Sequence, residues 1–205
     1  MRLLALTDLH GDLKALDRSL NSAGVVDAIL VLGDVGMTRA SIERAYRRLA
    51  REDRPVYVIH GNHESEDDAR ELAHEHGLIF VHRSVAPLED LFIVGYGDDG
   101  FSHERRDLDS FTSELPDLAH RSIVLTHAPP FDTPLDDLDG DHVGDVSVRR
   151  LIERAKPLVA LSGHLHENFH VGGTLGDSII ANPGLGTVVV ITETAQGYAV
   201  SLKRL

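Results

Sequence analysis

The chain contains no cysteine and no tryptophan. Without cysteine it can form no disulfide, no zinc ribbon and no thiol nucleophile. It also lacks any apolar run of about 18 residues, the length that predicts a membrane-spanning helix. The N-terminal apolar run is short, and Asp8 and His10 follow it before any small-residue cleavage site, which argues against a signal peptide. We therefore expect a cytoplasmic protein that does not enter a membrane.

Positive charge is scarce as well. The formal net charge is −13, and lysine occurs only as Lys14, Lys156 and Lys203. Such an acidic chain does not attract nucleic acid or anionic lipid non-specifically, so a long nucleic acid is not the expected partner. A small phosphate compound is still allowed, because bound divalent cations reverse the local charge. The acidic, arginine-rich composition fits either a high-salt cytoplasm or a GC-rich coding sequence, and the sequence leaves that choice open.

The N-terminal part of the chain alternates between strand-like and helix-like segments. Its composition is ordinary for a globular protein, with 42% hydrophobic and 26% charged residues. Asp12 is a predicted helix cap, and Gly24 is the predicted end of that helix. The periodicity predicts strands over 3–7, 28–32 and 56–59 and a helix over 64–75. A further helix is predicted from the apolar face Ile42, Ala45, Tyr46 and Leu49.

The C-terminal part is richer in strands. Only 146–155 reads clearly as a helix there, whereas strands are predicted over 91–95, 123–126, 158–161, 179–181, 187–192 and 198–202. A βαβαβ start followed by many strands predicts an α/β fold with two sheets packed face to face and helices outside. No repeat or linker divides the chain, so we expect one domain over 1–205. The segment 131–145 carries six Asp and is interpreted as a solvated loop in preference to a direct role in a site.

Polar residues with useful chemistry follow five of the predicted strands. Strand ends at one edge of a sheet are where layered α/β folds bind ligands. Taken singly, each motif has an ordinary explanation as a turn, a helix cap or a hydrogen-bonded histidine. The five motifs are Asp8-Leu9-His10, Gly33-Asp34, Gly61-Asn62-His63-Glu64, His127 and Gly163-His164-Leu165-His166.

Together these motifs supply carboxylate, amide and imidazole groups and no sulfur. Mixed nitrogen and oxygen donors of this kind suit Mn, Fe, Co, Ni or Zn. They are a poor match to calcium and magnesium, which prefer oxygen ligands throughout. The combined pattern therefore predicts a site for divalent transition-metal ions.

In their order and spacing the motifs resemble those of the calcineurin-like metallophosphoesterases. The pattern of that family is D-x-H, G-D, G-N-H-D/E, H and G-H-x-H, and the resemblance extends from Asp8 to His166. It implies the metallo-dependent phosphatase fold, a four-layer αββα sandwich of two mixed β-sheets flanked by helices. It also implies a small single-domain phosphodiesterase with two divalent metal ions, manganese being the favoured one.

The resemblance further implies a role for each residue. Asp34 bridges the two metals and takes part in catalysis. His63 binds no metal and lies over the substrate phosphate, which makes His63 a catalytic residue and Asn62 and His63 the substrate-binding pair. The ligands of the first metal would be Asp8, His10 and His166, and those of the second Asn62, His127 and His164.

The chemistry expected of such a centre follows from charge. Two cations about 3.5–4 Å apart need a bridging anion to offset their repulsion, and Asp34 would serve. A water between them would lose its proton near neutral pH and attack phosphorus, while the metals stabilise negative charge on the phosphoryl oxygens. The leaving alkoxide needs a proton, for which His63 is the candidate, although helix capping is the alternative interpretation.

Other residues carry weaker signals. Asn182-Pro183-Gly184 is similar to a turn near the site of many family members and either supports the ligand loops or is only a turn. His142 could contact substrate, although an ordinary loop position is the preferred interpretation. Asp98 and Asp99 are predicted turn residues. The histidines without ligand spacing are expected to be surface or structural: His60, His74, His76, His82, His103, His120 and His170.

Departures from the family pattern narrow the expected substrate. Ser/Thr protein phosphatases of the superfamily carry an arginine after the Gly-Asp motif and another before Gly-Asn-His. Here Val35-Gly36-Met37-Thr38 and His60 occupy those places, so the guanidinium clamp for phosphate is missing. This argues against a protein phosphatase, and the absence of the additional nuclease domain and the acidity argue against DNA processing.

A small-molecule phosphodiester, for example a cyclic nucleotide, is the predicted substrate. A small-molecule phosphomonoester is the second candidate. A non-catalytic scaffold on the same fold is the third, and it is disfavoured because no ligand position is lost. The sequence does not give the native metal, the substrate itself or the oligomeric state.

Overall fold

The strands of the computed structural model form two six-stranded sheets within the residues that the structure describes, 1–98, 100, 102–195 and 197–205. The first sheet has the order β14-β13-β1-β2-β3-β4, with β1 to β4 parallel and β13 antiparallel to β1. Its strands are β1 (Arg2–Leu6), β2 (Ala28–Leu32), β3 (Val56–Ile59), β4 (Ile79–Phe80), β13 (Thr187–Thr194) and β14 (Gly197–Arg204).

The second sheet has the order β11-β12-β10-β7-β6-β5, and it too mixes parallel and antiparallel pairs. Its four central strands, β12, β10, β7 and β6, are parallel. Its strands are β5 (Ser84–Leu88), β6 (Leu91–Tyr96), β7 (Ser122–Thr126), β10 (Val159–Ser162), β11 (Gly172–Leu175) and β12 (Ser178–Ala181).

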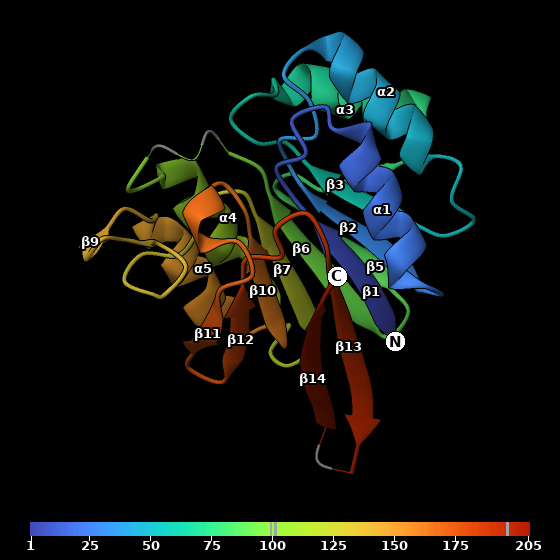
Figure 1. Cartoon of the computed structure of the whole chain (residues 1–205). Coiled ribbons are helices and arrows are strands. Elements are labelled where there is room, and N and C mark those ends of the chain that lie inside the picture. Colours follow the sequence, from blue (N-terminus) through green and yellow to red (C-terminus); the bar gives the residue numbers. More distant parts are fainter. Residues whose placement is uncertain (99, 101, 196) are drawn as a thin grey trace.

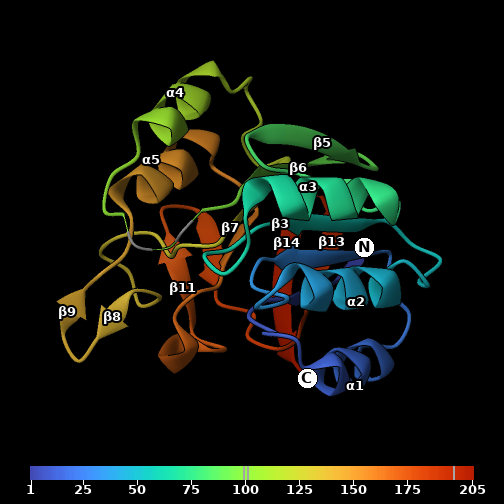
Figure 2. The ribbon, with the colours of Figure 1, turned by 90° about the horizontal axis from the view of Figure 1, so that it is seen from above.

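Five helices cover the outer faces of the two sheets in the described part of the chain (Figures 1 and 2). α1 (Leu13–Ala23), α2 (Arg39–Leu49) and α3 (Glu66–Glu75) share an apolar cluster with the first sheet. α4 (Arg106–Glu114) and α5 (Val146–Ala155) do so with the second. None of the described helices combines the length and apolar character that a membrane span requires.

Strict alternation along the strands produces these layers. On β1, Leu4 and Leu6 face the helices, while Leu3 and Ala5 face the second sheet. Successive side chains of a strand point to opposite faces, so one strand supplies two cores. The predicted four-layer αββα sandwich is therefore confirmed.

Several predicted boundaries are confirmed as well. Strands β2 and β3 and helix α5 have the predicted limits. Asp12 caps α1, because its Oδ1 accepts a hydrogen bond from the amide of Ala15 at 2.9 Å. Gly24 ends that helix with a φ of 67°, a left-handed conformation that glycine adopts without a steric penalty.

Other predictions from periodicity were wrong. The predicted helix 64–75 begins only at Glu66, after the cap Ser65, and Glu64 is buried outside it. α4 was missed because its sequence is polar and buries only Leu108 and Thr112. Strands β4, β5 and β11 were missed because they are short or lie at sheet edges, where the apolar pattern is weak.

The segment 131–145 is not the solvated loop that its composition predicted. It contains the hairpin β8 (Asp137–Leu138) and β9 (Asp141–His142), and two of its carboxylates, Asp136 and Asp145, are fully buried. The carboxylate of Asp136 accepts hydrogen bonds from the amides of Thr133 and Gly144 at 2.8 and 2.9 Å. Backbone donors thus replace the solvation that an aspartate would otherwise take from water.

The core contains one polar group whose removal should stabilise the protein. The hydroxyl of Tyr46, on α2, is buried without a hydrogen-bond partner among the described residues. A buried, unpaired polar group costs about 1–3 kcal/mol. Tyr46→Phe should therefore raise the free energy of unfolding by about 1 kcal/mol in urea denaturation.

Tyr57→Phe provides the matched control. The Tyr57 hydroxyl donates to the carbonyl oxygen of Pro87 at 2.6 Å, so its removal should lower the free energy of unfolding by about 1 kcal/mol. Equal destabilisation by both substitutions would show that the Tyr46 hydroxyl has a partner after all.

Candidate metal centre

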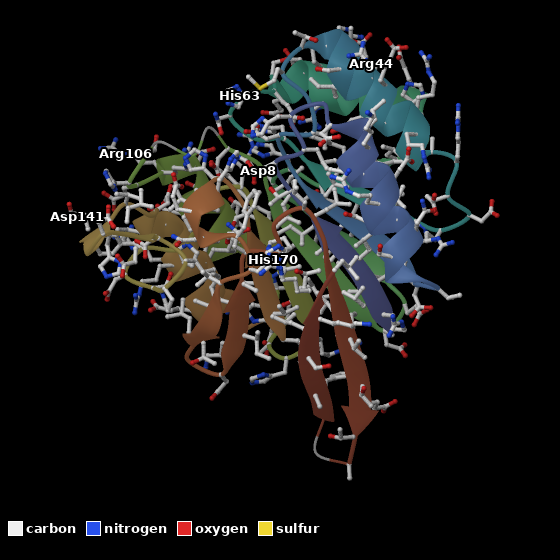
Figure 3. All side chains as sticks on the ribbon, in the orientation of Figure 1. Asp8, Arg44, His63, Arg106, Asp141 and His170 are labelled. Carbon is white, nitrogen blue, oxygen red and sulfur yellow. The ribbon has the colours of Figure 1, made fainter. Side chains whose placement is uncertain are left out.

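The five motifs meet at one end of the molecule. Each follows the carboxyl end of a parallel strand, namely β1, β2 or β3 of the first sheet, or β7 or β10 of the second. Figure 3 shows Asp8 and His63 at this end. Backbone hydrogen bonds join the loops, because the amide of His10 donates to the carbonyl oxygen of Asp34 at 2.8 Å and that of Gly163 to His127 at 3.0 Å.

Two glycines of the motifs allow the loops to approach one another. A Cβ atom on Gly61 would lie 2.3 Å from Oδ1 of Asp34 and 2.6 Å from Cε1 of His127. A Cβ atom on Gly163 would lie 2.1 Å from Oγ1 of Thr7. These distances are shorter than any non-bonded contact, so both positions need glycine to bring the two sheets together.

Four of the predicted ligands have left-handed backbone conformations. The φ angles are 54° at Asp8, 47° at His10, 53° at Asp34 and 70° at His164. Such conformations cost on the order of 1 kcal/mol each for residues other than glycine, and they cluster at functional sites. Here they turn each side chain away from its strand and towards a common centre.

The first cluster of donor atoms consists of Asp8, His10 and His166. Oδ1 of Asp8 is buried without a hydrogen-bond partner in the described part of the chain, and it lies 3.8 Å from Nε2 of His10 and 3.4 Å from Nε2 of His166. The two Nε2 atoms are 3.1 Å apart. One buried carboxylate oxygen and two imidazole nitrogens this close together form a set that fits a cation.

The contact of His10 with Met37 fixes the form of its imidazole. Nδ1 of His10 lies 3.2 Å from the sulfur of Met37. A thioether can only accept a hydrogen bond, so Nδ1 carries the hydrogen and Nε2 keeps its lone pair for a metal. Burial lowers the pKa of His10, against the opposing effect of Asp34 and Asp8, which also favours the neutral ligand form.

The second cluster surrounds the side-chain oxygen of Asn62. This Oδ1 lies 2.9 Å from Nε2 of His127 and 3.0 Å from Nδ1 of His164. Nδ1 of His127 lies 2.9 Å from the carbonyl oxygen of Leu32 and must donate to it. Its Nε2 lone pair then faces oxygen lone pairs, an arrangement that needs a cation or a proton between the atoms.

The charges around His127 also favour a cation at this position. Burial acts against its protonated form, but the carboxylates of Asp8, Asp34 and Asp98 outweigh this effect and raise its pKa. Positive charge is thus favoured at a position with no exposure to solvent. A metal ion would satisfy the same field.

Asp34 lies between the two clusters. Its Oδ2 is 3.6 Å from Nε2 of His127. A carboxylate oxygen of Asp34 also lies within 4.8 Å of a ligand atom of Asp8 and of one of His10. Oδ1 of Asp34 accepts the backbone amide of His63 at 2.9 Å. The structure therefore brings all seven predicted ligands together and places Asp34 where a bridge would have to be, while the individual ligand roles stay predictions.

Glu64 holds two of the ligand loops, a role that the sequence did not reveal. Its buried carboxylate accepts the amides of Asp34 at 3.0 Å, Val35 at 2.7 Å, Gly36 at 3.3 Å and Gly61 at 3.1 Å. Burial, together with the charge of Asp34, raises the pKa of Glu64 to about 7, although the amide donors act in the opposite direction. The position of Glu64 at the end of the Gly-Asn-His motif is the sequence feature that could have indicated this role.

Asn182 supports the loop that carries His164 and His166. Its side-chain amide donates to the carbonyl oxygen of Leu165 at 3.0 Å, and its Oδ1 accepts the amide of Gly184 at 3.0 Å. Of the two interpretations of Asn182-Pro183-Gly184, support of the ligand loop is confirmed.

Asp98 is more than the predicted turn residue. Its Oδ1 accepts the amide of Gly100 at 2.6 Å, as a turn residue would, but its Oδ2 also accepts the amide of Ala128 at 3.2 Å, beside His127. Asp99 lies outside the described residues.

His142 is anchored within its own hairpin. Its Nδ1 lies 2.9 Å from Oδ1 of Asp136, and this contact raises the pKa of His142. The suggested contact of His142 with substrate stays a prediction.

In a third group of potential ligands, His60, Glu66 and His82, the hydrogen bonds of His82 argue against metal binding. The amide of Gly97 donates to Nδ1 of His82 at 3.0 Å, so the hydrogen of this imidazole is on Nε2, which lies 3.5 Å from Oε2 of Glu66. No lone pair of His82 is then available for a metal. Burial and the neighbouring His60 lower its pKa to about 4, so the ring is neutral.

The remaining histidines without ligand spacing are exposed or half-buried, as predicted. They are His74, His76, His103, His120 and His170.

Comparison with known proteins agrees with this geometry. Residues 1–168 match the sequence profile of the family described as calcineurin-like phosphoesterase. Among solved structures, the chain is similar to TT1561 of Thermus thermophilus, with a TM-score of 0.68 and 18% identity over 98% of this chain and 97% of that one. It is also similar to phosphopantetheinyl hydrolase from Mycobacterium tuberculosis, with a TM-score of 0.66 and 15% identity over 89% and 88%. At such identities the structural likeness concerns the fold alone. A comparison with proteins of curated function finds no match.

The role of Glu64 can be tested by replacing its carboxylate with an amide. In Glu64→Gln, the new NH₂ group would face backbone amides that now donate to an oxygen. At least one of these buried amides would lose its acceptor, and a buried donor without a partner costs about 1–3 kcal/mol, so the free energy of unfolding should fall by about 3 kcal/mol. Urea denaturation measures this, and metal titration should show weaker binding because the loops of Asp34 and Asn62 lose their common anchor.

Glu71→Gln is the control, because this exposed residue of α3 pairs with Arg39 at the surface and with no other residue that the structure describes. It should change the free energy of unfolding by less than about 1 kcal/mol. If Glu64→Gln were equally mild, the four amide contacts would not be what holds the loops.

Proposed function

Since the chain belongs to the calcineurin-like phosphoesterase family, we propose that it hydrolyses a small-molecule phosphodiester, such as a cyclic nucleotide, with two divalent transition-metal ions. The observation that carries the proposal is the pair of donor clusters on either side of Asp34, one around Oδ1 of Asp8 and one around Oδ1 of Asn62. Manganese is the metal that we favour for both clusters.

The ligand roles in this proposal follow the two clusters. Asp8, His10 and His166 would hold one ion, and Asn62, His127 and His164 the other, with Asp34 shared between them. When bound, the ions would supply positive charge at the phosphoryl oxygens and would lower the pKa of a water. The protein would hold this centre rigidly, since both buried carboxylates are fixed by hydrogen bonds from neighbouring loops.

His63 is placed to act on the substrate in this proposal. Its imidazole packs edge-on against the ring of His10 with 5.1 Å between centroids, and its Nε2 lies 4.0 Å from Oδ2 of Asp34. The side chain is 40% exposed, whereas that of Asp34 is 2% exposed. An imidazole at the solvent side of the centre could donate a proton to the leaving oxygen.

The groups facing solvent favour a diester over a monoester. They are the imidazoles of His63 and His166 and, to a smaller extent, that of His10. The guanidinium group of Arg105 does not serve as a phosphate clamp, because it already pairs with the buried carboxylate of Asp145 at 2.9 Å and with that of Asp98 at 3.8 Å. A dianionic monoester would gain most from a guanidinium clamp, so we propose the singly charged diester as the substrate and the monoester as the alternative.

Metal content provides the direct test of this proposal. Elemental analysis of protein reconstituted with manganese should find two ions per chain, because there are two donor clusters. Chelation should abolish the hydrolysis of bis-p-nitrophenyl phosphate, and added metal should restore it. A fully loaded protein that cleaves neither this diester nor p-nitrophenyl phosphate would support the scaffold interpretation instead.

The bridging role of Asp34 makes a separate prediction. Asp34→Asn removes a charge and one bridging oxygen, so both ions should bind more weakly, as measured by titration. His10→Ala should weaken mainly one of them. Full occupancy and full rate in Asp34→Asn would contradict a shared ligand.

Substitution of His63 should separate chemistry from metal binding. General acid catalysis contributes about 10²–10⁴-fold, so His63→Ala should lose that much in kcat for diesters with poor leaving groups. The loss should be small for bis-p-nitrophenyl phosphate, since p-nitrophenolate leaves without a proton.

Metal analysis of the same variant is the control, and two bound ions are expected. An equal and small loss for both substrates would indicate that His63 positions phosphate. Loss of metal from the variant would make His63 a structural residue.

A further inference from the structure

A second concave site lies beside α1, away from the metal ligands. It is a hollow of about 440 Å³ between α1, the residues after the His164–His166 loop, and the end of β14. This volume is within the range of about 300–1,000 Å³ that is typical of small-molecule sites. None of the seven predicted metal ligands is among the residues that line it.

The hollow has apolar walls and two guanidinium groups. Ala15, Phe169 and Leu185 contribute apolar surface, and Arg18 and Arg204 contribute positive charge. No aspartate or glutamate is among its lining residues. In a chain with a net charge of −13, a hollow lined by two arginines and by no aspartate or glutamate is a local exception.

Neither arginine has a buried acidic partner among the residues that the structure describes. The side chain of Arg204 makes no hydrogen bond or ion pair with any of them. Within the same described ranges Arg18 reaches only Asp12, at 4.0 Å, and both of these side chains are largely exposed. Ion pairs of that kind contribute little, so an anion entering the hollow would have little competition.

The third nitrogen group of the hollow, His170, adds no charge of its own (Figure 3). Burial and the neighbouring Arg204 lower its pKa, so the ring is neutral near pH 7. The anion-binding capacity therefore belongs to the guanidinium groups, which stay charged across the physiological range.

Phe169 separates the hollow from the metal centre. Its ring packs against the ring of His166 on one side, with 4.9 Å between centroids, and against that of His170 on the other, with 6.4 Å. A molecule in the hollow would thus contact the far side of Phe169 and no metal ligand.

We propose that this hollow binds an amphipathic organic anion. Its carboxylate, sulfonate or phosphate group lies between Arg18 and Arg204, and its apolar body packs against Ala15, Phe169 and Leu185. The site is independent of the metal centre and does not need the proposed hydrolytic activity.

The probe 8-anilinonaphthalene-1-sulfonate has this chemistry and reports binding by fluorescence. We expect one molecule per chain, and Arg204→Glu should weaken binding by about tenfold or more, because a charge-assisted contact is replaced by repulsion. Arg106→Glu is the control (Figure 3). This residue is exposed on α4, it changes the net charge equally, and its substitution should leave binding unchanged.

A second pair of variants tests the location by size. Ser22 lines the hollow from an exposed position on α1, so Ser22→Trp should block binding without altering any charge. The neighbouring Asn21 is equally exposed but is not part of the lining, and Asn21→Trp should bind normally.

Chelation distinguishes the hollow from the metal centre, which could also attract a sulfonate. Binding that survives removal of the metals supports the proposal, and binding that disappears with them overturns it. Equal effects of Arg204→Glu and Arg106→Glu, or of Ser22→Trp and Asn21→Trp, would overturn it too.

Discussion

The structure around the candidate centre depends on one electrostatic constraint. Asp8 and Asp34 bring two carboxylates into the interior at the junction of the sheets, with residue exposures of 4% and 1%. Burying such charge without a partner is prohibitively costly, so it must be paired with a cation or satisfied by hydrogen bonds. In each carboxylate one oxygen accepts a backbone amide and the other faces imidazole nitrogens. The first oxygen fixes the side chain, and the second keeps lone pairs that a metal ion could bind.

Most of the strands and helices could be predicted from the sequence, because hydrophobic periodicity is a local property of the chain. Leu3 to Leu6 are apolar at every position, and this is how a strand covered on both faces reads. The candidate ligands were found for a related reason, since each follows directly on such a strand and is of a type that packs poorly in a core. Position at a strand end and donor chemistry are both visible in a short window of sequence.

What could not be predicted depends on contacts between distant segments. The sequence did not show that Glu64, Asp98 and Asp136 are buried and accept backbone amides. The donors to Glu64 include amides about thirty residues away, so no local pattern marks the pairing. α4 was missed for the complementary reason, because it buries few of its residues and its periodicity is correspondingly faint.

The motif Gly61-Asn62-His63-Glu64 shows how four adjacent residues serve four different purposes. Gly61 gives space to Asp34 and His127, and the side-chain oxygen of Asn62 faces two imidazoles. Glu64 points inwards and joins the loops, whereas the side chain of His63 points to solvent. The only hydrogen bond from His63 to Asp34 uses its backbone amide, which every residue except proline provides. Among the described residues the His63 imidazole itself makes no hydrogen bond, so it is available for the role on a substrate that we propose for it.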